Sequence, residues 1–176
     1  RLWIALFMVV LLSPLLRAQV PADSLPRPNT ARLATVIGTE ALIHTGLMIG
    51  LNELWYKDFP RSPLHSFNDN REWLQMDKVG HAMTAYSVGL LGMESMRWAG
   101  LNERSSRWWG GAAGWFFLSS VEVLDGYSEE WGFSWGDVAS NTIGAGLLIG
   151  QDALWHEQRM TLKFSFRQSP YAKIRP

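Results

Sequence analysis

Four long apolar stretches constrain the fold of this 176-residue chain more than any other feature. They cover approximately residues 31–55, 77–98, 106–124 and 134–155. Each stretch is several times longer than a typical β-strand of about 5–6 residues. Segments rich in turn-forming residues, 59–70 and 126–133 among them, separate the stretches. This pattern predicts an all-α fold, a bundle of about four helices.

Local signals support two of the predicted helix starts. Asn29 or Thr30 can cap the first helix, because a short polar side chain can accept a hydrogen bond from a free backbone N–H. Ser134 precedes the last helix, and Asp137 stands three residues later, where a capping box carries its acid.

The N-terminal residues read as an export signal. An apolar run from Leu2 to Leu16 is followed by Arg17 and Ala18. This pattern is typical of a secretory signal peptide cleaved after Ala18, or of an uncleaved N-terminal anchor over residues 1–18. Residues 19–30 contain three prolines and are predicted to form a linker.

The helical domain is therefore expected over residues 31–158, followed by an extended tail over 159–176. In that tail Leu162, Phe164 and Phe166 alternate with polar residues, which is the period of a β-strand. Because both ends look cut, we interpret the sequence as a fragment of a longer chain.

Composition favours a membrane-associated protein. Only 18% of the residues are charged, below the roughly 25% usual in soluble domains. The formal net charge is zero, so nothing indicates a nucleic-acid partner. There are no cysteines, which excludes disulfides, thiolate metal sites and a lipid-bearing cysteine within these residues.

The last three stretches have the length and composition of membrane spans. Each offers about 19–22 residues with few interior charges, and their many glycines and alanines allow close helix packing in lipid. Basic residues dominate the segments after the second and fourth stretches, whereas Glu129 and Glu130 lie between the third and fourth. We expect these three to span, with the 126–133 side outside the cytoplasm and the first stretch packed or membrane-lying. A soluble periplasmic bundle remains the alternative.

Polar residues gather at one end of the predicted bundle. If the last three helices run up, down and up, the start of the second helix, the end of the third and the start of the fourth meet. The candidate site residues there are Asp77, Lys78, His81, Glu122, Asp125, Asp137 and Asn141.

Three kinds of chemistry fit this cluster. An imidazole with carboxylates can bind a divalent metal, for which His81, Glu122, Asp125 and Asp137 are the candidate ligands. Crowded carboxyl groups can also divide into an acid and a base, so catalysis stays open. Alternatively, the cluster is structural, because carboxylates such as Asp77 and Asp137 are favoured in first helical turns. No hydrolase or nucleotide-binding motif is present.

The motif Asp-Lys-x-x-His at 77–81, an acid at Glu122 and Ser-x-x-Asp-x-x-x-Asn-x-x-Gly from Ser134 resemble the VanZ-like membrane family. The longer strings 122–128 and 131–134 resemble an uncharacterised YfiM-like family of predicted periplasmic lipoproteins. The resemblance covers roughly residues 76–151 and implies a bacterial cell-envelope location. The missing cysteine departs from the lipoprotein pattern.

Together these observations predict a cell-envelope membrane protein of unspecified activity. Its extracytoplasmic polar cluster would bind or process an envelope lipid or glycan headgroup, with Lys78 meeting an anionic group. The alternative is a non-enzymatic structural or accessory protein whose cluster fixes helix packing. Apart from a divalent metal, no cofactor is implied.

Overall fold

The structure is a computed structural model that describes residues 28–71, 73–163 and 165. Its four long helices are α2 (Thr30–Leu54), α3 (Met76–Trp98), α5 (Ala113–Asp125) and α6 (Trp135–Trp155). Short helical turns lie between them: η2 (Tyr56–Asp58), η3 (Trp73–Gln75), α4 (Glu103–Ser105) and η4 (Ser106–Gly110). The predicted all-α architecture of four helices is confirmed.

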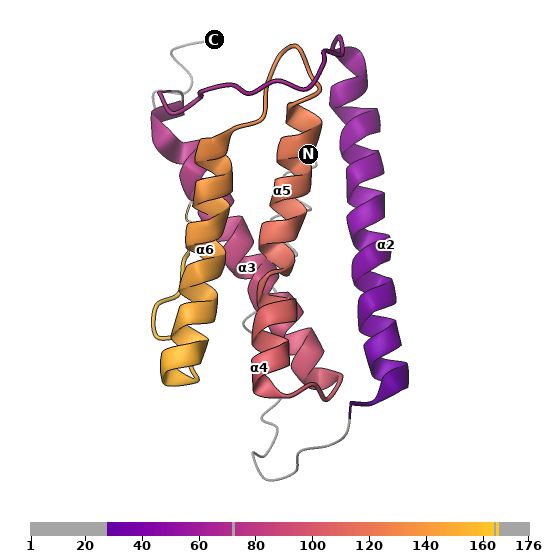
Figure 1. The fold of residues 1–176 in the computed structure, drawn as a ribbon, viewed down its shortest axis with the longest axis vertical. Helices are drawn as coiled ribbons and strands as arrows, with labels where there is room; N and C mark the ends of the chain where they lie inside the picture. Colours follow the sequence, from indigo (N-terminus) through magenta and orange to yellow (C-terminus); the bar gives the residue numbers. More distant parts are fainter. Residues whose placement is uncertain (1–27, 72, 164, 166–176) are drawn as a thin grey trace.

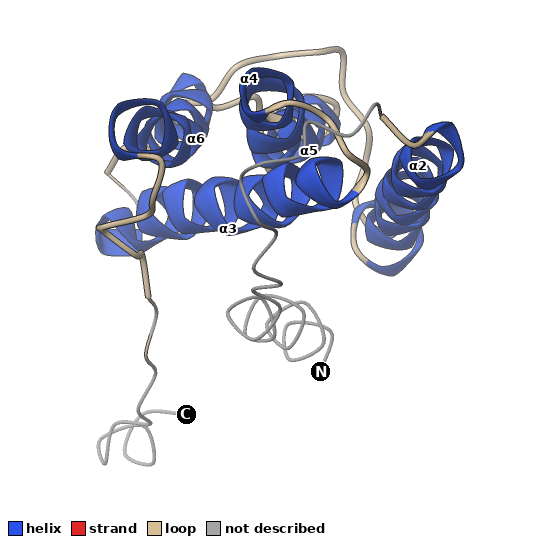
Figure 2. Ribbon diagram, turned by 90° about the horizontal axis from the view of Figure 1, so that it is seen from below, coloured by secondary structure: helices blue, strands red, loops and turns tan. Residues whose placement is uncertain are grey.

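The helices alternate in direction along the chain. α3 crosses diagonally behind α5 and α6, and α2 stands at the edge of the bundle beside α5 (Figure 1). Seen from below, α6 and α5 lie on one side of α3, and α2 stands apart beyond one end of α3 in this view (Figure 2). The ends of α2 and α5 and the starts of α3 and α6 therefore lie at the same end of the molecule.

Glycines let α3 lie close against its neighbours. A Cβ atom on Gly144 of α6 would overlap the carbonyl oxygen of Ala82, and one on Gly114 of α5 would overlap that of Ala85. Farther along the same contact, Tyr86, Met93 and Leu148 form a buried core cluster. Small residues at these positions thus decide how closely the backbones approach.

The third predicted helix is not continuous. The stretch expected over 106–124 divides into the π-helical turn η4 and the α-helix α5, with Gly111 and Ala112 between them. At the break, Gly110 lies against the backbone of Gly92 in α3 so closely that a Cβ would overlap it. Two adjacent glycines and this tight contact explain why regular α-helix gives way here.

An ion-pair network holds the end of the bundle opposite the predicted cluster. Arg97 of α3 lies 2.5 Å from Asp152 Oδ1, and Arg107 of η4 lies 2.7 Å from Asp152 Oδ2. The Asp152 side chain on α6 is 2% exposed. One buried carboxylate therefore ties three elements together.

The predicted strand in the tail is not observed in the part of the chain that the structure describes; Phe164 and Phe166 lie outside it. His156 ends α6 in a left-handed conformation (φ 55°) and turns the chain back. Backbone N–H of Met160 then donates to Gln151 Oε1 at 2.5 Å, and Leu162 packs against the Tyr86 core cluster. Contacts with α3 and α6 shape these residues instead of pairing with another strand.

α2 differs from the other helices in being apolar and largely uncovered. Asn29 caps it, as one of the two predicted alternatives, by accepting from Arg32 N–H at 3.0 Å. Val36 is its one buried residue. Together with η2 it is the helix, among the described residues, long and apolar enough to cross a membrane.

The expectation that residues 77–98, 106–124 and 134–155 form the spanning unit is not met. By the same criterion of length and hydropathy, α3, α5 and α6 do not qualify. α5 has only 13 residues, and polar residues interrupt the apolar face of α3. The small residues that suggested packing in lipid pack these three helices against one another. The predicted signal segment 1–18 and most of the linker 19–30 lie outside the described residues.

Two loops cover the end of the bundle at which α5 ends and α6 begins. The predicted loops 59–70 and 126–133 pair through isolated bridges, Arg61 with Ser128 and Ser66 with Phe133. Backbone bonds such as Phe67 N–H to the Phe133 carbonyl, at 3.0 Å, hold them together. This pairing carries Asp69 over the polar cluster.

Candidate functional site

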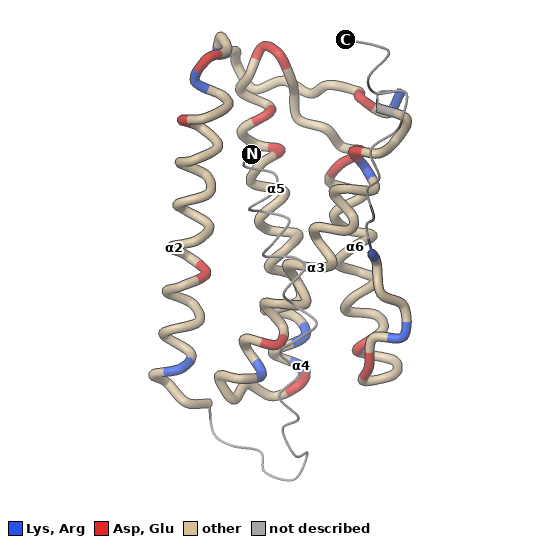
Figure 3. Tube along the Cα trace, turned by 180° about the vertical axis from the view of Figure 1, so that it is seen from behind, with Lys and Arg blue, Asp and Glu red and all other residues tan. Residues whose placement is uncertain are grey.

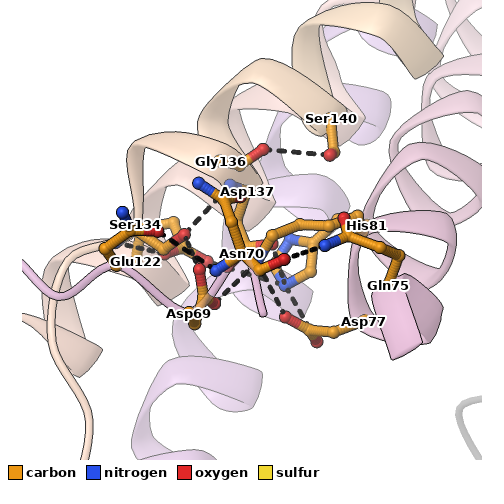
Figure 4. Close-up of polar contacts among 12 residues, drawn as sticks. Asp69, Asn70, Gln75, Asp77, His81, Glu122, Ser134, Gly136, Asp137 and Ser140 are labelled. Carbon is orange, nitrogen blue, oxygen red and sulfur yellow. Dashed lines mark hydrogen bonds and ion pairs between the residues drawn. The ribbon is translucent and has the colours of Figure 1, made fainter. Parts of the chain in front are cut away.

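The structure brings six of the seven predicted site residues into one connected polar cluster and places the seventh, Asp125, at its edge. They come from the start of α3, the end of α5 and the start of α6, where acidic positions gather in Figure 3. The close-up in Figure 4 shows the side chains of α3 pointing toward those of α6 and Glu122. The whole set is Asp77, Lys78, His81, Glu122, Asp125, Asp137 and Asn141.

Ser134 organises the side of the cluster formed by α6. It caps the helix by accepting from Asp137 N–H at 3.2 Å, as the capping-box pattern predicted. Its hydroxyl donates to Asp69 Oδ1 at 2.7 Å, and its own N–H donates to Glu122 Oε2 at 3.1 Å. The helix start, the covering loop and α5 are therefore joined through one residue (Figure 4).

Lys78 is held between carboxylates. Its ammonium lies 2.6 Å from Asp69 Oδ2 and 2.8 Å from Asp137 Oδ1, and the side chain is 11% exposed. Burial acts to lower the pKa of Lys78, but its bonds to Asp137 and Asp69 outweigh burial and raise it. Burial likewise opposes, but does not prevent, a lowered pKa of Asp69. The ammonium is thus already paired within the protein.

His81 is oriented by Asn141. Its Nδ1 lies 3.0 Å from Asn141 Oδ1, an atom that can only accept, so Nδ1 carries the proton. Nε2 then faces three carboxylate oxygens at longer range: Glu122 Oε1 at 3.6 Å, Asp77 Oδ1 at 3.7 Å and Asp137 Oδ1 at 3.9 Å.

The remaining acids are short of positive partners. Burial, followed by the neighbouring carboxylates of Asp137 and Asp125, raises the pKa of Glu122 to about 8. Burial also raises the pKa of Asp125 to about 6, and it raises the pKa of Asp137. Because the cluster holds more carboxyl groups than positive partners for them, it can bind a cation or a hydrogen-bond donor.

Tyr56, just beyond α2, joins the cluster through its hydroxyl, which donates to Asp125 Oδ1 at 2.5 Å. An aromatic group surrounds this link: the ring of Trp131 lies 5.8 Å from Trp55, 5.6 Å from Tyr56 and 4.6 Å from Phe59. The end of the apolar helix is thereby fixed to the end of α5.

Three residues within the described part could hold a metal ion. One ligand atom each from Asp77, His81 and Asp137 lies within 4.8 Å of the other two. His81 and Asp137 were expected as ligands from the sequence, and both belong to this group. Asp77 also belongs to it, whereas the expected ligands Glu122 and Asp125 do not. Glu122 nevertheless presents Oε1 to the same imidazole nitrogen.

Asp69 and Tyr56 belong to the site although the sequence pattern did not predict them. Asp69 lies in a loop, where only the polar run Asn68-Asp69-Asn70 before α3 hinted at a role. Tyr56 sits among aromatic residues at a helix end, and nothing local distinguishes it from an interfacial anchor. Both reach the cluster through contacts between segments far apart in the sequence.

A protein-family comparison matches the segment that carries the cluster. Residues 66–150 match the family described as Predicted periplasmic lipoprotein (DUF2279). No curated protein matches the chain, and no solved structure matches it. The matched segment begins in the loop that holds Asp69 and contains all seven predicted site residues. It supports the predicted periplasmic lipoprotein resemblance and the cell-envelope location, while the YfiM-like and VanZ-like names stay predictions.

Proposed function

We propose that this chain is a cell-envelope protein whose polar cluster binds the headgroup of an envelope lipid or glycan at a membrane surface. The observation that carries the proposal is the hydrogen bond from Tyr56 to Asp125. It fixes the cluster to the end of the one described helix with the length and hydropathy of a membrane span.

The position of the cluster follows from α2. Its 25 residues, at about 1.5 Å of rise each, exceed the roughly 30 Å of a bilayer's hydrocarbon core. Trp55 and Trp131, at the end where the cluster lies, are the residue type that favours the headgroup region. With α2 across a bilayer, a site bonded to this end of the helix would lie at headgroup depth.

The charge of the cluster predicts which headgroups it accepts. Lys78 is paired with Asp69 and Asp137, so the ammonium expected to meet an anionic group is not available for that role. The surrounding carboxyl groups favour amine or hydroxyl donors, as carried by phosphatidylethanolamine or by a sugar.

Native mass spectrometry of the full chain in mixed micelles tests the proposal. We expect phosphatidylethanolamine to be retained in preference to phosphatidylcholine, and the preference to fall at least several-fold in Asp77→Asn. Glu129→Gln, a change at an exposed acid in the covering loop, is the matched control. Equal retention of both lipids by the wild type would contradict the proposal.

A second candidate is a non-enzymatic accessory protein whose cluster fixes helix packing. The observation that favours it is the bridging of loop, α3 and α6 by the Lys78 ion pairs. In that case Lys78→Met lowers the unfolding midpoint strongly, while neither lipid is retained preferentially by the wild type.

A further inference from the structure

We propose that His81, Asp77 and Asp137, with Glu122 as a fourth ligand, bind a divalent transition-metal ion such as Zn²⁺. The site lies where α3, α5 and α6 meet, and its nitrogen ligand is His81 Nε2. The proposal shares the location of the proposed headgroup site and rests on the proposed function only for that location.

The His81 imidazole makes the kind of hydrogen bond that is typical of a metal-binding histidine. A metal-binding histidine usually donates its second ring N–H to an oxygen, which fixes the tautomer and aims the other nitrogen at the metal. Asn141 supplies that oxygen at 3.0 Å from Nδ1, and Asn141 is fully buried. The lone pair of Nε2 therefore points at the carboxylates.

The spacing around Nε2 suits a metal ion better than a proton. The oxygens of Glu122, Asp77 and Asp137 lie 3.6, 3.7 and 3.9 Å away, too far for good hydrogen bonds. Two ligand atoms that share a metal at about 2.0–2.2 Å can stand up to about 4.2 Å apart. Each of these oxygens therefore stands at a distance from Nε2 that a shared metal ion would span, and the ligand atoms of Asp77, His81 and Asp137 also lie within 4.8 Å of one another.

One buried polar atom beside the imidazole supplies an independent indication of a ligand. Asn141 Nδ2 has no hydrogen-bond partner in the part of the chain that the structure describes. On Glu122, whose side chain is 2% exposed, Oε2 accepts from Ser134 N–H, and Oε1 lies 3.6 Å from His81 Nε2. A buried amide donor without an acceptor is costly unless a ligand, such as a metal-bound water, accepts its hydrogen bond.

The ligand set selects the class of metal. One imidazole nitrogen with three carboxylate groups is a mixed nitrogen and oxygen set, suited to Zn²⁺ or Mn²⁺. Ca²⁺ prefers six to eight oxygen ligands, more than these side chains offer. Lys78 contacts the same Asp137 Oδ1 at 2.8 Å and Asp77 Oδ2 at 3.4 Å, so a bound ion would share Asp137 with the ammonium.

Isothermal titration of the chelator-treated full chain with ZnCl₂ tests the site. We expect one Zn²⁺ per chain and an affinity at least tenfold weaker in Asp77→Asn. The Asp77 side chain is 44% exposed, so its amide variant should keep its metal-free unfolding midpoint. His81→Asn should lose the binding altogether.

Two matched controls separate this site from surface binding. Asp58→Asn removes an exposed carboxylate, and His156→Asn removes an exposed imidazole while keeping a residue type that tolerates positive φ. Both should bind Zn²⁺ as the wild type does. No stoichiometric Zn²⁺ binding, or equal binding by Asp77→Asn and the wild type, would overturn the proposal. Because no lipid or glycan is present, this outcome is independent of the headgroup experiment.

Discussion

At the scale of single residues, two glycines on α6 show how closely this bundle is packed. Gly144 faces α3, and a Cβ atom there would overlap the Ala82 carbonyl oxygen. Gly146, two residues on, has nothing within 4 Å of the equivalent position. The same residue type is a packing requirement at one site and an avoidable loss of helix stability at the other.

We expect Gly144→Ala to lower the free energy of unfolding by about 1–3 kcal/mol or more, because the helices must separate. Gly146→Ala should instead raise it by up to about 1 kcal/mol, the usual gain of alanine over glycine in a helix. Urea denaturation of the two variants measures both effects. Changes of the same sign would contradict the α3–α6 packing described above.

Asp152 should make stability depend on pH at the opposite end. Burial acts to raise its pKa, but hydrogen bonds from Arg97 and Arg107 outweigh burial and lower it. The stabilisation is therefore complete above the ordinary carboxyl pKa of about 3.9 and is lost as pH falls through the lower folded-state value. At neutral pH, Asp152→Asn should cost about 1.5–3 kcal/mol, because the partly buried Arg107 loses its carboxylate partner while Arg97 keeps Glu94 and Glu103.

Thermal unfolding across pH checks this expectation. The difference between wild type and Asp152→Asn should shrink below about pH 4, where the Asp152 carboxylate of the unfolded wild type begins to protonate while the folded one does not. A difference that stays constant down to pH 2 would show that the ion pairs contribute little.

At the scale of elements, the positions of most helices could be predicted from the sequence, whereas most contacts between elements could not. The lengths of the apolar stretches and the capping residue Ser134 were enough to place α2, α3 and α6 to within a residue or two. The break at Gly110, the pairing of the two loops and the return of the tail onto α6 depend on partners distant in sequence. A pattern of hydrophobicity contains no information about such partners.

The bond between Tyr56 and Asp125 is the contact that joins η2 to α5. We expect Tyr56→Phe to lower the free energy of unfolding by about 1–3 kcal/mol, because the partly buried Asp125 side chain is left without its donor. Tyr127→Phe, at a side chain that is 43% exposed, is the control. Equal effects of the two changes in chemical denaturation would remove the argument that this bond fixes the end of α2.

The site shows the same division between predictable and unpredictable parts. Alternation of helix direction was enough to predict that seven residues from three helices meet. The contacts within the cluster could not be predicted. Lys78 forms ion pairs with Asp69 and Asp137, and His81 forms a hydrogen bond with Asn141 through one ring nitrogen. Those contacts follow from side-chain geometry and from a loop that local sequence leaves undefined.

At the scale of the whole molecule, α2 presents an apolar surface that the bundle does not cover. Leu42 is 76% exposed and Ile43 is 56% exposed, near the middle of the helix. Contiguous apolar surface of this kind marks a contact with lipid or with another protein. The length of α2 and the cell-envelope location favour lipid.

A charge at the middle of α2 should weaken that contact. We expect Leu42→Arg to move a large share of the protein into the soluble fraction on carbonate extraction of membranes, because arginine at the bilayer centre costs about 2.5–3.5 kcal/mol. Leu64→Arg, at a similarly exposed loop position (57%), is the control. Unchanged membrane retention of Leu42→Arg would indicate that another segment holds the chain in the membrane.

The claim that the cluster is a binding site is tested most directly by the unfolding midpoint of chelator-treated wild type and His81→Asn, each with and without Zn²⁺. A site kept for binding contributes little or negatively to stability. We therefore expect the metal-free midpoints to be equal, or higher in His81→Asn, and Zn²⁺ to raise only the wild type. A His81→Asn midpoint many degrees lower without metal, with no response to Zn²⁺ in either protein, would show instead that the cluster serves helix packing.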